Sequence, residues 1–314
     1  MNPDADVKDG MPDGARPLTD GVRRALLVAI LAASGALMWC GFTSGHDWGD
    51  DFASYIMQAR SVLDGHPARF MAENRLTIEG SDLPLGPVAY PWGYPVLLLP
   101  VYALFGMNMV ALKCVGAVCF LLFLAVLAFA MRRVHGAAWL LGLVCLFAFN
   151  PFLLEFTNHI LSDLPFLLLS TLSALLIVRF VVDRRVLISR AADAILLGVL
   201  MALASLIRSN GWLLPVTLGF TQAVEAVRRR PLAGVNPGSV GRAVGGRWVA
   251  ALPYLAFAAV AAPWQIVFPE GETTHFGYFR SLSPGMVMGN LHYYLELPAD
   301  FFQPLPEGTR LLVF

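Results

Sequence analysis

Long uninterrupted apolar blocks are the feature that most constrains this chain. They recur along a sequence of 314 residues, of which 57% are hydrophobic and only 14% are charged. A soluble domain carries about 25% charged residues, so the composition excludes a water-soluble enzyme, a disordered chain and a disulfide scaffold. The net charge of zero provides no basic field for nucleic acid. The sequence therefore predicts an integral membrane protein without a nucleic-acid partner.

The blocks predict an all-α polytopic membrane protein with about seven transmembrane helices. A spanning helix needs about 20 mostly apolar residues, and seven stretches approach or exceed this length. They are residues 25–42, 109–131, 136–156, 164–182, 191–207, 211–227 and 248–268. Residues 1–24 precede them and are polar and rich in Asp, Gly and Pro, which favours a disordered cytoplasmic tail.

The distribution of basic residues predicts the orientation of the chain. The apolar stretch 94–107 is only 14 residues long and is bounded by prolines and a glycine, which favours an interfacial or re-entrant segment over a span. With this choice, 14 of the 22 basic residues gather on one side, within 1–24, 132–135, 183–193 and 225–247. The positive-inside rule makes that side cytoplasmic. Residues 45–108 and 269–314 are then expected to face outward.

The outward segment 45–108 begins with a predicted amphipathic helix. Between Asp51 and Asp64, apolar residues recur at helical spacing, and Gly65 is placed to end the helix. We expect this helix to lie along the membrane. Asp50 and Asp51 stand at its N-terminus, where they could cap the helix and favour its dipole. Alternatively, a carboxylate at the membrane surface could act as general base on an acceptor hydroxyl or amine.

Several motifs along the chain resemble one enzyme superfamily. They are the run YPWGYP at 90–95 continued to Gly106, the pair NPF and LSDLPF between 150 and 166, LIRSNG at 206–211, and NLHYYL at 290–295. Together with the acidic pair at 50 and 51, they resemble the GT-C glycosyltransferases, in particular the bacterial relatives of protein mannosyltransferases and of the lipid A aminoarabinose transferase. The resemblance implies an inverting transfer of a sugar from a polyprenyl-phosphate-linked donor on the outer face of the bacterial inner membrane.

The resemblance also implies roles for individual residues. Asp50 matches the catalytic acidic residue and is expected to be the general base, with Asp51 and Asp163 shaping the acceptor and donor sites. Asp163 has a second interpretation, as the N-cap of the helix that contains Pro165 in its first turn. We also expect donor-phosphate contacts from Arg208, Arg75 and Lys113, and substrate contacts from Tyr55, Tyr90, Tyr94 and His159. For Arg208 the alternative is an interaction with the C-terminus of its own helix.

The expected partners are the polyprenyl-phosphate sugar donor, membrane lipids and an acceptor glycan, lipid or protein. The pattern requires no cofactor, although a divalent metal at Asp50 and Asp51 is compatible with it. Two other classes stay open, namely a transporter or flippase-like protein and a non-catalytic membrane scaffold. Domain organisation is expected to be a GT-C-like transmembrane domain over 25–268 followed by an outward tail over 269–314. Because the family usually runs longer, the protein is either naturally short or the N-terminal part of a longer chain with a truncated tail.

Overall fold

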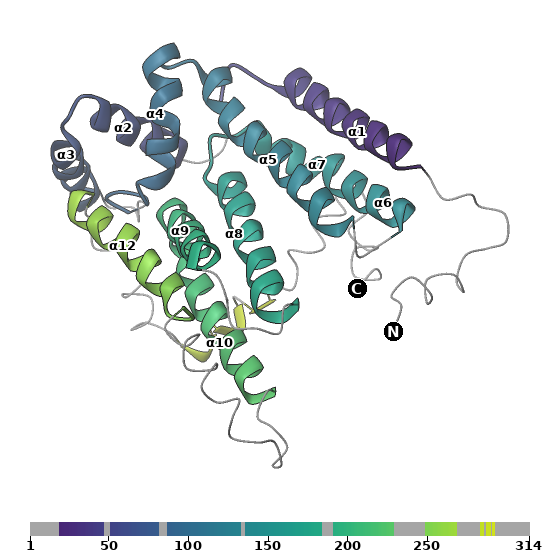
Figure 1. Ribbon diagram of the computed structural model, residues 1–314. Helices are drawn as coiled ribbons and strands as arrows, with labels where there is room; N and C mark the ends of the chain where they lie inside the picture. The colour runs from purple at the N-terminus through teal and green to yellow at the C-terminus, as the bar shows by residue number, and fades with distance from the viewer. Residues whose placement is uncertain are drawn as a thin grey trace.

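The computed structural model describes six stretches of the chain and a few residues of the tail. The stretches are 19–46, 51–81, 87–132, 136–183, 191–228 and 249–268, and the tail residues are 283–285, 287–289 and 291–292. Every element within them is helical (Figure 1). The described part of the chain is therefore an all-α assembly of apolar helices, as expected for a membrane protein. Predictions for residues 1–18, 47–50, 229–248 and most of 269–314 lie outside the described residues.

Within the described residues, three helices are long and apolar enough to cross a bilayer. They are α1 (Asp20–Gly41), α5 (Met109–Met131) and the stretch Asp163–Val182, which joins α8 (Asp163–Ile177) to a π-helical segment, η1 (Val178–Asp183). Side chains cap the first two. Thr19 accepts a hydrogen bond from the backbone of Val22, and Asn108 accepts one from Ala111. These caps satisfy backbone N–H groups that a helix start leaves without partners.

A fourth apolar segment is broken rather than straight. The predicted span 136–156 forms α6 (Ala137–Ala148) and α7 (Pro151–Thr157), which meet at 53°. Pro151 occupies the first turn of α7, and the Asn150 side chain accepts a hydrogen bond from the backbone of Leu153 at 3.1 Å. A proline at this position disfavours helical backbone in the residue before it. The Asn-Pro pair thus ends one helix and starts another.

The predicted count of seven spans is not reproduced by the described helices. By length and composition they provide three spans, or four if α6 and α7 form one bent span. Three further helices are apolar but shorter: α4 (Gly93–Phe105), α9 (Ala191–Ile207) and α12 (Leu252–Val267). The predicted span 211–227 forms a 3₁₀ turn, η2 (Ser209–Trp212), and α10 (Leu213–Arg228). Polar side chains at Thr217, Thr221, Gln222 and Glu225 lower the apolar character of α10.

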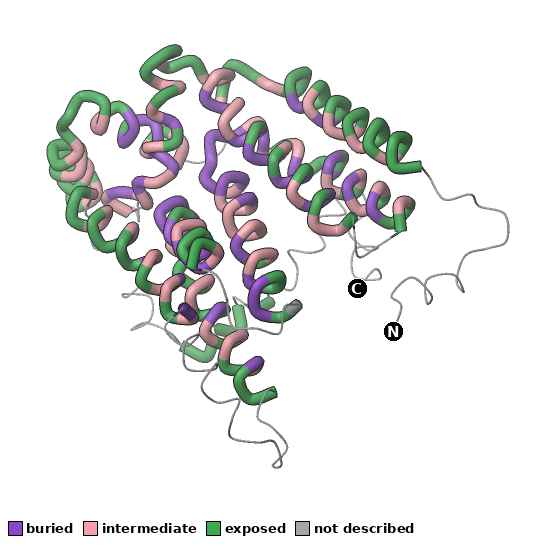
Figure 2. Tube along the Cα trace, viewed as in Figure 1, coloured by how far each residue is buried: buried purple, intermediate pink, exposed green. Residues whose placement is uncertain are grey.

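The helices are buried on the faces by which they pack together and exposed on their other faces (Figure 2). Many of the exposed side chains are large and apolar. One core cluster joins α8, α9, α10 and α12 through residues such as Ile177, Leu197 and Phe257. Another joins α1, α5, α6 and α8 around Phe120 and Leu124. Leu104 on α4, Trp139 on α6 and Ile266 on α12 remain more than 70% exposed. Such an apolar exterior is unfavourable in water and suits contact with lipid.

The segment 45–108, which the sequence predicts to face outward, contains α2 (Asp51–Leu63) and α3 (Pro67–Glu79). The extent of α2 confirms the predicted helix, and Gly65 follows it with φ of +74°, a conformation that glycine adopts without strain. Part of its apolar face packs against protein. Tyr55, Ile56 and Ala59 are buried in a cluster with Tyr94 and Leu98 of α4. The surface that covers this face is thus supplied at least in part by α4, and the position of α2 along the membrane stays a prediction.

Candidate functional site

A cavity of about 210 Å³ lies where four separate segments meet. They are the start of α2, the segment 87–91, the residue before α8 and the turn after α9. The residues that line the cavity are Asp51, Tyr55, Pro87, Ala89, Tyr90, Pro91, Ser162, Ile207, Arg208, Ser209 and Asn210. Four residues predicted from the sequence, namely Asp51, Tyr55, Tyr90 and Arg208, are thus brought together in one cavity.

The carboxylate of Asp51 is held by Tyr90. The Tyr90 hydroxyl donates to Asp51 Oδ1 at 2.5 Å. The backbone of Tyr90 is fixed in turn by the side-chain amide of Gln58, whose Nε2 donates to the carbonyl oxygen at 2.9 Å and whose Oε1 accepts from the N–H at 3.1 Å. Because Gln58 is fully buried, these bonds are shielded from water. Asp51 therefore faces the cavity in a defined orientation.

Arg208, which lines the cavity, forms an ion pair with Asp163. The distance between Arg208 Nη1 and Asp163 Oδ2 is 2.5 Å. Asp163 is the first residue of α8, and Ser162 takes the N-cap position that the sequence also allowed for Asp163. Arg208 has extended backbone between α9 and η2, with φ of −146°. Arg208 lines the cavity. Asp163 does not line it and is linked to it by the ion pair with Arg208.

Tyr55 supplies a hydroxyl that stays neutral. Its oxygen lies 3.1 Å from Ser162 Oγ, and the side chain is only 4% exposed. Burial raises the pKa of Tyr55 to about 12, with the nearby Asp51 carboxylate adding to the effect. Tyr94 packs edge-on against Tyr55 with ring centroids 4.9 Å apart, but it does not line the cavity. Tyr94 thus supports Tyr55 from behind.

Two other predicted residues, Lys113 and His159, are buried and do not line the cavity. Lys113 is fully buried, and its ammonium group donates to the carbonyl oxygens of Thr43 and Gly45 at 2.8 and 2.6 Å and to Asn158 Oδ1 at 2.8 Å. His159 is 4% exposed in an aromatic cluster, with its ring 5.3 Å from that of His46. The structure therefore does not bring Lys113 or His159 to the other candidates.

Two further predicted residues, Arg75 and Asp50, are not among the described residues that line the cavity. Arg75 lies on α3 beside a separate groove, which is described below. Asp50 lies outside the described residues, immediately before the start of α2 at Asp51. Among the described residues, no group of three or more His, Cys, Asp and Glu side chains is close enough to hold a metal ion. The metal site considered at Asp50 and Asp51 includes a residue without a described position.

Four cavity or support residues were not singled out from the sequence: Gln58, Ser162, Ser209 and Asn210. Ser162 and the pair Ser209-Asn210 directly flank Asp163 and Arg208, so their proximity to the site followed from motifs already identified. Gln58 had a separate signal, because it is a polar residue on the otherwise apolar face of the predicted α2. A polar group on a buried face usually has a specific hydrogen-bond partner.

The arrangement combines a carboxylate, a guanidinium and neutral hydroxyls at one cavity. A carboxylate can accept a proton, a guanidinium can bind a phosphate or another anion, and hydroxyls and an amide can orient a polyhydroxylated ligand. Comparisons with protein-family models, with curated proteins and with solved structures find no match. The chemistry of the cavity is therefore the basis for assigning a function.

Proposed function

We propose that this protein is a membrane glycosyltransferase that takes its sugar from a polyprenyl-phosphate-linked donor. The observation that carries the proposal is the shared cavity of Asp51 and Arg208 within an assembly of apolar helices. A lipid-linked substrate keeps its chain in the membrane while its phosphate and sugar meet polar groups. In such a reaction the acceptor loses a proton and the departing phosphate gains negative charge. A carboxylate in the cavity can accept the proton, and an arginine can stabilise the phosphate.

In the proposed reaction, a carboxylate accepts the proton of an acceptor hydroxyl or amine as that group attacks the anomeric carbon. The bond between this carbon and the phosphate oxygen breaks, and the electron pair leaves with the polyprenyl phosphate. A single displacement of this kind inverts the anomeric configuration. Arg208 stabilises the departing phosphate, because a guanidinium has five N–H donors and its ion pair with Asp163 fixes its position.

Asp50 is our choice as general base, as the resemblance to GT-C enzymes implies, and Asp51 shapes the acceptor site. The hydrogen bond from Tyr90 supports this role for Asp51, since it engages one oxygen of the carboxylate. The hydroxyl of Tyr55 and the side chains of Ser209 and Asn210 are available to orient the sugar or acceptor.

We further propose that the cavity faces the outside of the bacterial inner membrane, with the N-terminus in the cytoplasm. The support comes from the basic residues, 14 of which gather in segments expected on the opposite side from Asp51, Asp163 and Arg208. At the outer face, a lipid-linked donor can meet an acceptor glycan, lipid or protein.

The proposal is tested by sugar transfer in membranes that contain the chain. Polyprenyl-phosphate donors carrying different radiolabelled hexoses and pentoses are supplied, and the release of polyprenyl phosphate and the labelled product are both measured. Asp50→Asn keeps the shape and capping ability of the side chain but removes proton acceptance. Loss of a general base should lower turnover by about 10²–10⁴-fold, with unchanged expression and thermal stability.

The companion variant Asp51→Asn separates the two carboxylates. An inactive Asp51→Asn beside a fully active Asp50→Asn would move the base to Asp51. Full activity of both variants would reject the catalytic assignment. If the wild type consumes no donor of the panel but moves lipid or solute across vesicles, the transporter or flippase alternative replaces the enzyme.

A further inference from the structure

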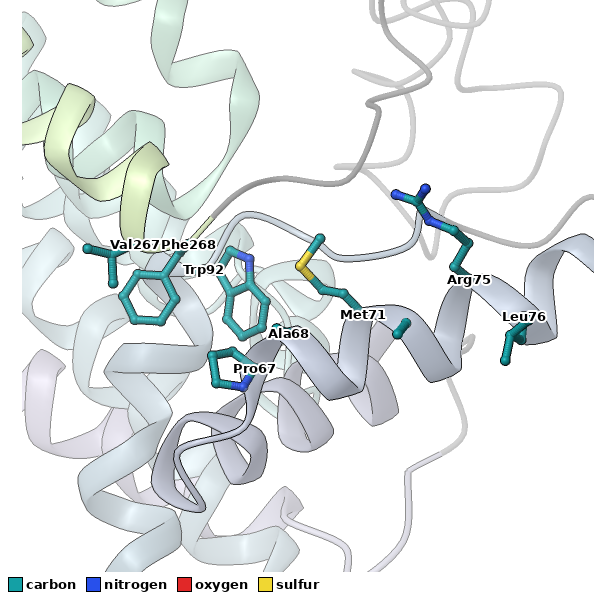
Figure 3. A pocket seen from close by; sticks show the side chains of 9 residues that line it. Pro67, Ala68, Met71, Arg75, Leu76, Trp92, Val267 and Phe268 are labelled. Carbon is teal, nitrogen blue, oxygen red and sulfur yellow. The ribbon is translucent and has the colours of Figure 1, made fainter.

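A second hollow, of about 570 Å³, lies between α3, Trp92 and the end of α12 (Figure 3). Its lining residues are Pro67, Ala68, Met71, Ala72, Arg75, Leu76, Trp92, Val267 and Phe268. We call this hollow the α3 groove. Its walls are apolar, and Arg75 is the one charged side chain among these nine residues. The α3 groove and the cavity share no lining residue.

The indole of Trp92 forms part of the groove wall and brings a polar N–H group to this apolar surface. The side chain is fully buried, yet its Nε1 has no hydrogen-bond partner within the described structure. Leaving such a buried donor unsatisfied costs roughly 1–3 kcal/mol. Its ring stacks obliquely on Phe268, with centroids 5.4 Å apart, which fixes the indole against the end of α12. A ligand with an acceptor oxygen would satisfy this N–H.

Arg75 gives the α3 groove a positive charge that the described protein does not neutralise. Arg69, on the same helix, pairs with Glu73 at 2.7 Å, whereas Arg75 makes no ion pair with any described residue. No acidic side chain lines the groove. In Figure 3 the Arg75 guanidinium and the nitrogen of Trp92 lie on the same side of α3, with Met71 between them. An anionic group with a free acceptor oxygen matches these two donors.

The groove continues into surface that suits lipid chains. Val267 is 63% exposed, the adjacent Ile266 is 82% exposed, and Leu76 on α3 is 72% exposed. An acyl chain lying along these residues would cover apolar surface that is otherwise open. An inorganic anion would leave the same surface uncovered, so the apolar wall favours a ligand that has a hydrocarbon chain as well as a charge.

We propose that the α3 groove binds an anionic phospholipid of the surrounding bilayer. Its phosphodiester lies at Arg75, an acceptor oxygen of the headgroup or glycerol receives the Trp92 N–H, and an acyl chain lies against Met71 and the end of α12. This inference is independent of glycosyl transfer. It also reassigns Arg75, from the expected donor-phosphate contact to a site for a lipid that is not consumed.

The bound lipid would contact a residue that is adjacent in sequence to one wall of the cavity. Ala89, Tyr90 and Pro91 line the cavity, and the next residue, Trp92, lines the α3 groove. Occupation of the groove should therefore hold the segment that positions Tyr90 against Asp51. This is a consequence of the lipid site and is not needed for it.

The test uses the full chain in nanodiscs that contain phosphatidylcholine with a minor fraction of phosphatidylglycerol. After release into a mild detergent, native mass spectrometry counts the phosphatidylglycerol retained per chain. Arg75→Gln should lower this retention about tenfold or more, as expected for loss of one charge-assisted hydrogen bond. Trp92→Phe keeps the aromatic wall and should lower retention by about two- to tenfold.

Arg69→Gln is the matched control, because it removes an arginine about one and two-thirds turns earlier on the same exposed helix. Unchanged retention in Arg69→Gln supports the groove, whereas an equal loss in both arginine variants would indicate general surface charge and overturn it. Retention of wild-type amounts by Arg75→Gln would also overturn it. Arg75-dependent retention of added polyprenyl phosphate in place of phosphatidylglycerol, or displacement of the lipid by inorganic phosphate alone, would assign the groove to another ligand and reject the proposal.

Discussion

At the scale of single residues, Asp163 and Arg208 form a pair that stability alone does not explain. Both side chains retain more than a third of their surface, 36% for Arg208 and 38% for Asp163. Ion pairs with this exposure contribute about 0–1 kcal/mol to folding. The pair nevertheless joins the start of α8 to the turn after α9, beside a cavity that contains Asp51. Its position is better explained by what Arg208 can bind.

We therefore expect Arg208→Gln to separate stability from activity. The free energy of unfolding should change by less than about 1 kcal/mol, while sugar transfer should fall by about 10²–10³-fold, the loss typical of a removed oxyanion-stabilising donor. Thermal unfolding in detergent and transfer from the polyprenyl-phosphate donor measure the two quantities. Arg60→Gln, which removes an exposed arginine paired with Asp64 at 3.4 Å, should alter neither. Transfer by Arg208→Gln at the wild-type rate would exclude Arg208 from the site.

Lys113, unlike Arg208, is expected to contribute to the stability of the fold. Its ammonium group is buried and donates to Thr43, Gly45 and Asn158, so it ties the chain after α1 to the end of α7. Lys113→Met should destabilise the protein by at least about 2 kcal/mol, because it removes these hydrogen bonds from a charged group, each worth roughly 1.5–3 kcal/mol. The midpoint of thermal unfolding checks this. Leu122→Ala, at a half-exposed position on the same helix, should shift it little. A stable Lys113→Met with weakened donor binding would instead restore the phosphate role expected from the sequence.

At the scale of helices, the sequence predicted α2 well because two independent signals coincide. Apolar residues recur at helical spacing from Phe52 to Leu63, and Gly65 ends the pattern. The same periodicity does not identify what covers the apolar face, and the packing against α4 was not expected. The break between α6 and α7 had a signal in Asn150-Pro151, but continuous hydrophobicity across it was interpreted as one span. Hydrophobicity locates apolar segments better than it locates their breaks.

The crossing of α9 and α12 depends on Gly198. A Cβ added there would lie 2.3 Å from the carbonyl oxygen of Pro253 and 2.7 Å from Ala256 Cβ. Small residues allow apolar helices to approach this closely. Gly198→Ala should therefore force the helices apart and lower the unfolding free energy by about 1–3 kcal/mol.

Gly142→Ala is the control for this element, since a Cβ at Gly142 of α6 meets no atom within 4 Å. It should be neutral or stabilise the protein by up to about 1 kcal/mol, because alanine is favoured over glycine inside a helix. Denaturant unfolding in detergent compares the two variants. Equal stability of both would mean that α9 and α12 do not cross closely.

At the scale of the whole molecule, the cavity gathers residues that the sequence could place only on one side of the membrane. The charge argument put Asp51, Asp163 and Arg208 on the same side, and the cavity brings Asp51 and the ion pair together. Arg208 contacts Asp163 because α9 returns from the far end of α8 to the start of that helix. Such pairing between distant segments has no local signal, so neither the bond of Gln58 to Tyr90 nor the contact of Arg208 with Asp163 followed from spacing.

The return of α9 also bears on the number of membrane passes. The stretch Asp163–Val182 is long enough to span, and α9 packs beside it through Leu197 and Val181 before ending at Arg208. Although α9 has only 17 residues, it covers most of the same depth, about 26 Å at 1.5 Å per residue. Helix length alone is therefore not a sufficient criterion for counting membrane passes. The number of passes can be tested by measuring on which side of the membrane each connecting segment lies.

We expect positions 187 and 238 to lie in the cytoplasm and position 80 to lie outside. The expectation follows from the basic residues in 183–193 and 225–247 and from the excess of acidic residues in 45–108. Single cysteines replace Gly80, Leu187 or Gly238 on a background without the four natural cysteines, and a membrane-impermeant maleimide is applied to intact cells. Position 80 should be labelled at once, and the other two only after the membrane is opened. Labelling of positions 187 and 238 from opposite sides would show that α9 and α10 together cross an odd number of times. Labelling of positions 80 and 238 from the same side would overturn the orientation, and with it the outward cavity that the proposed reaction requires.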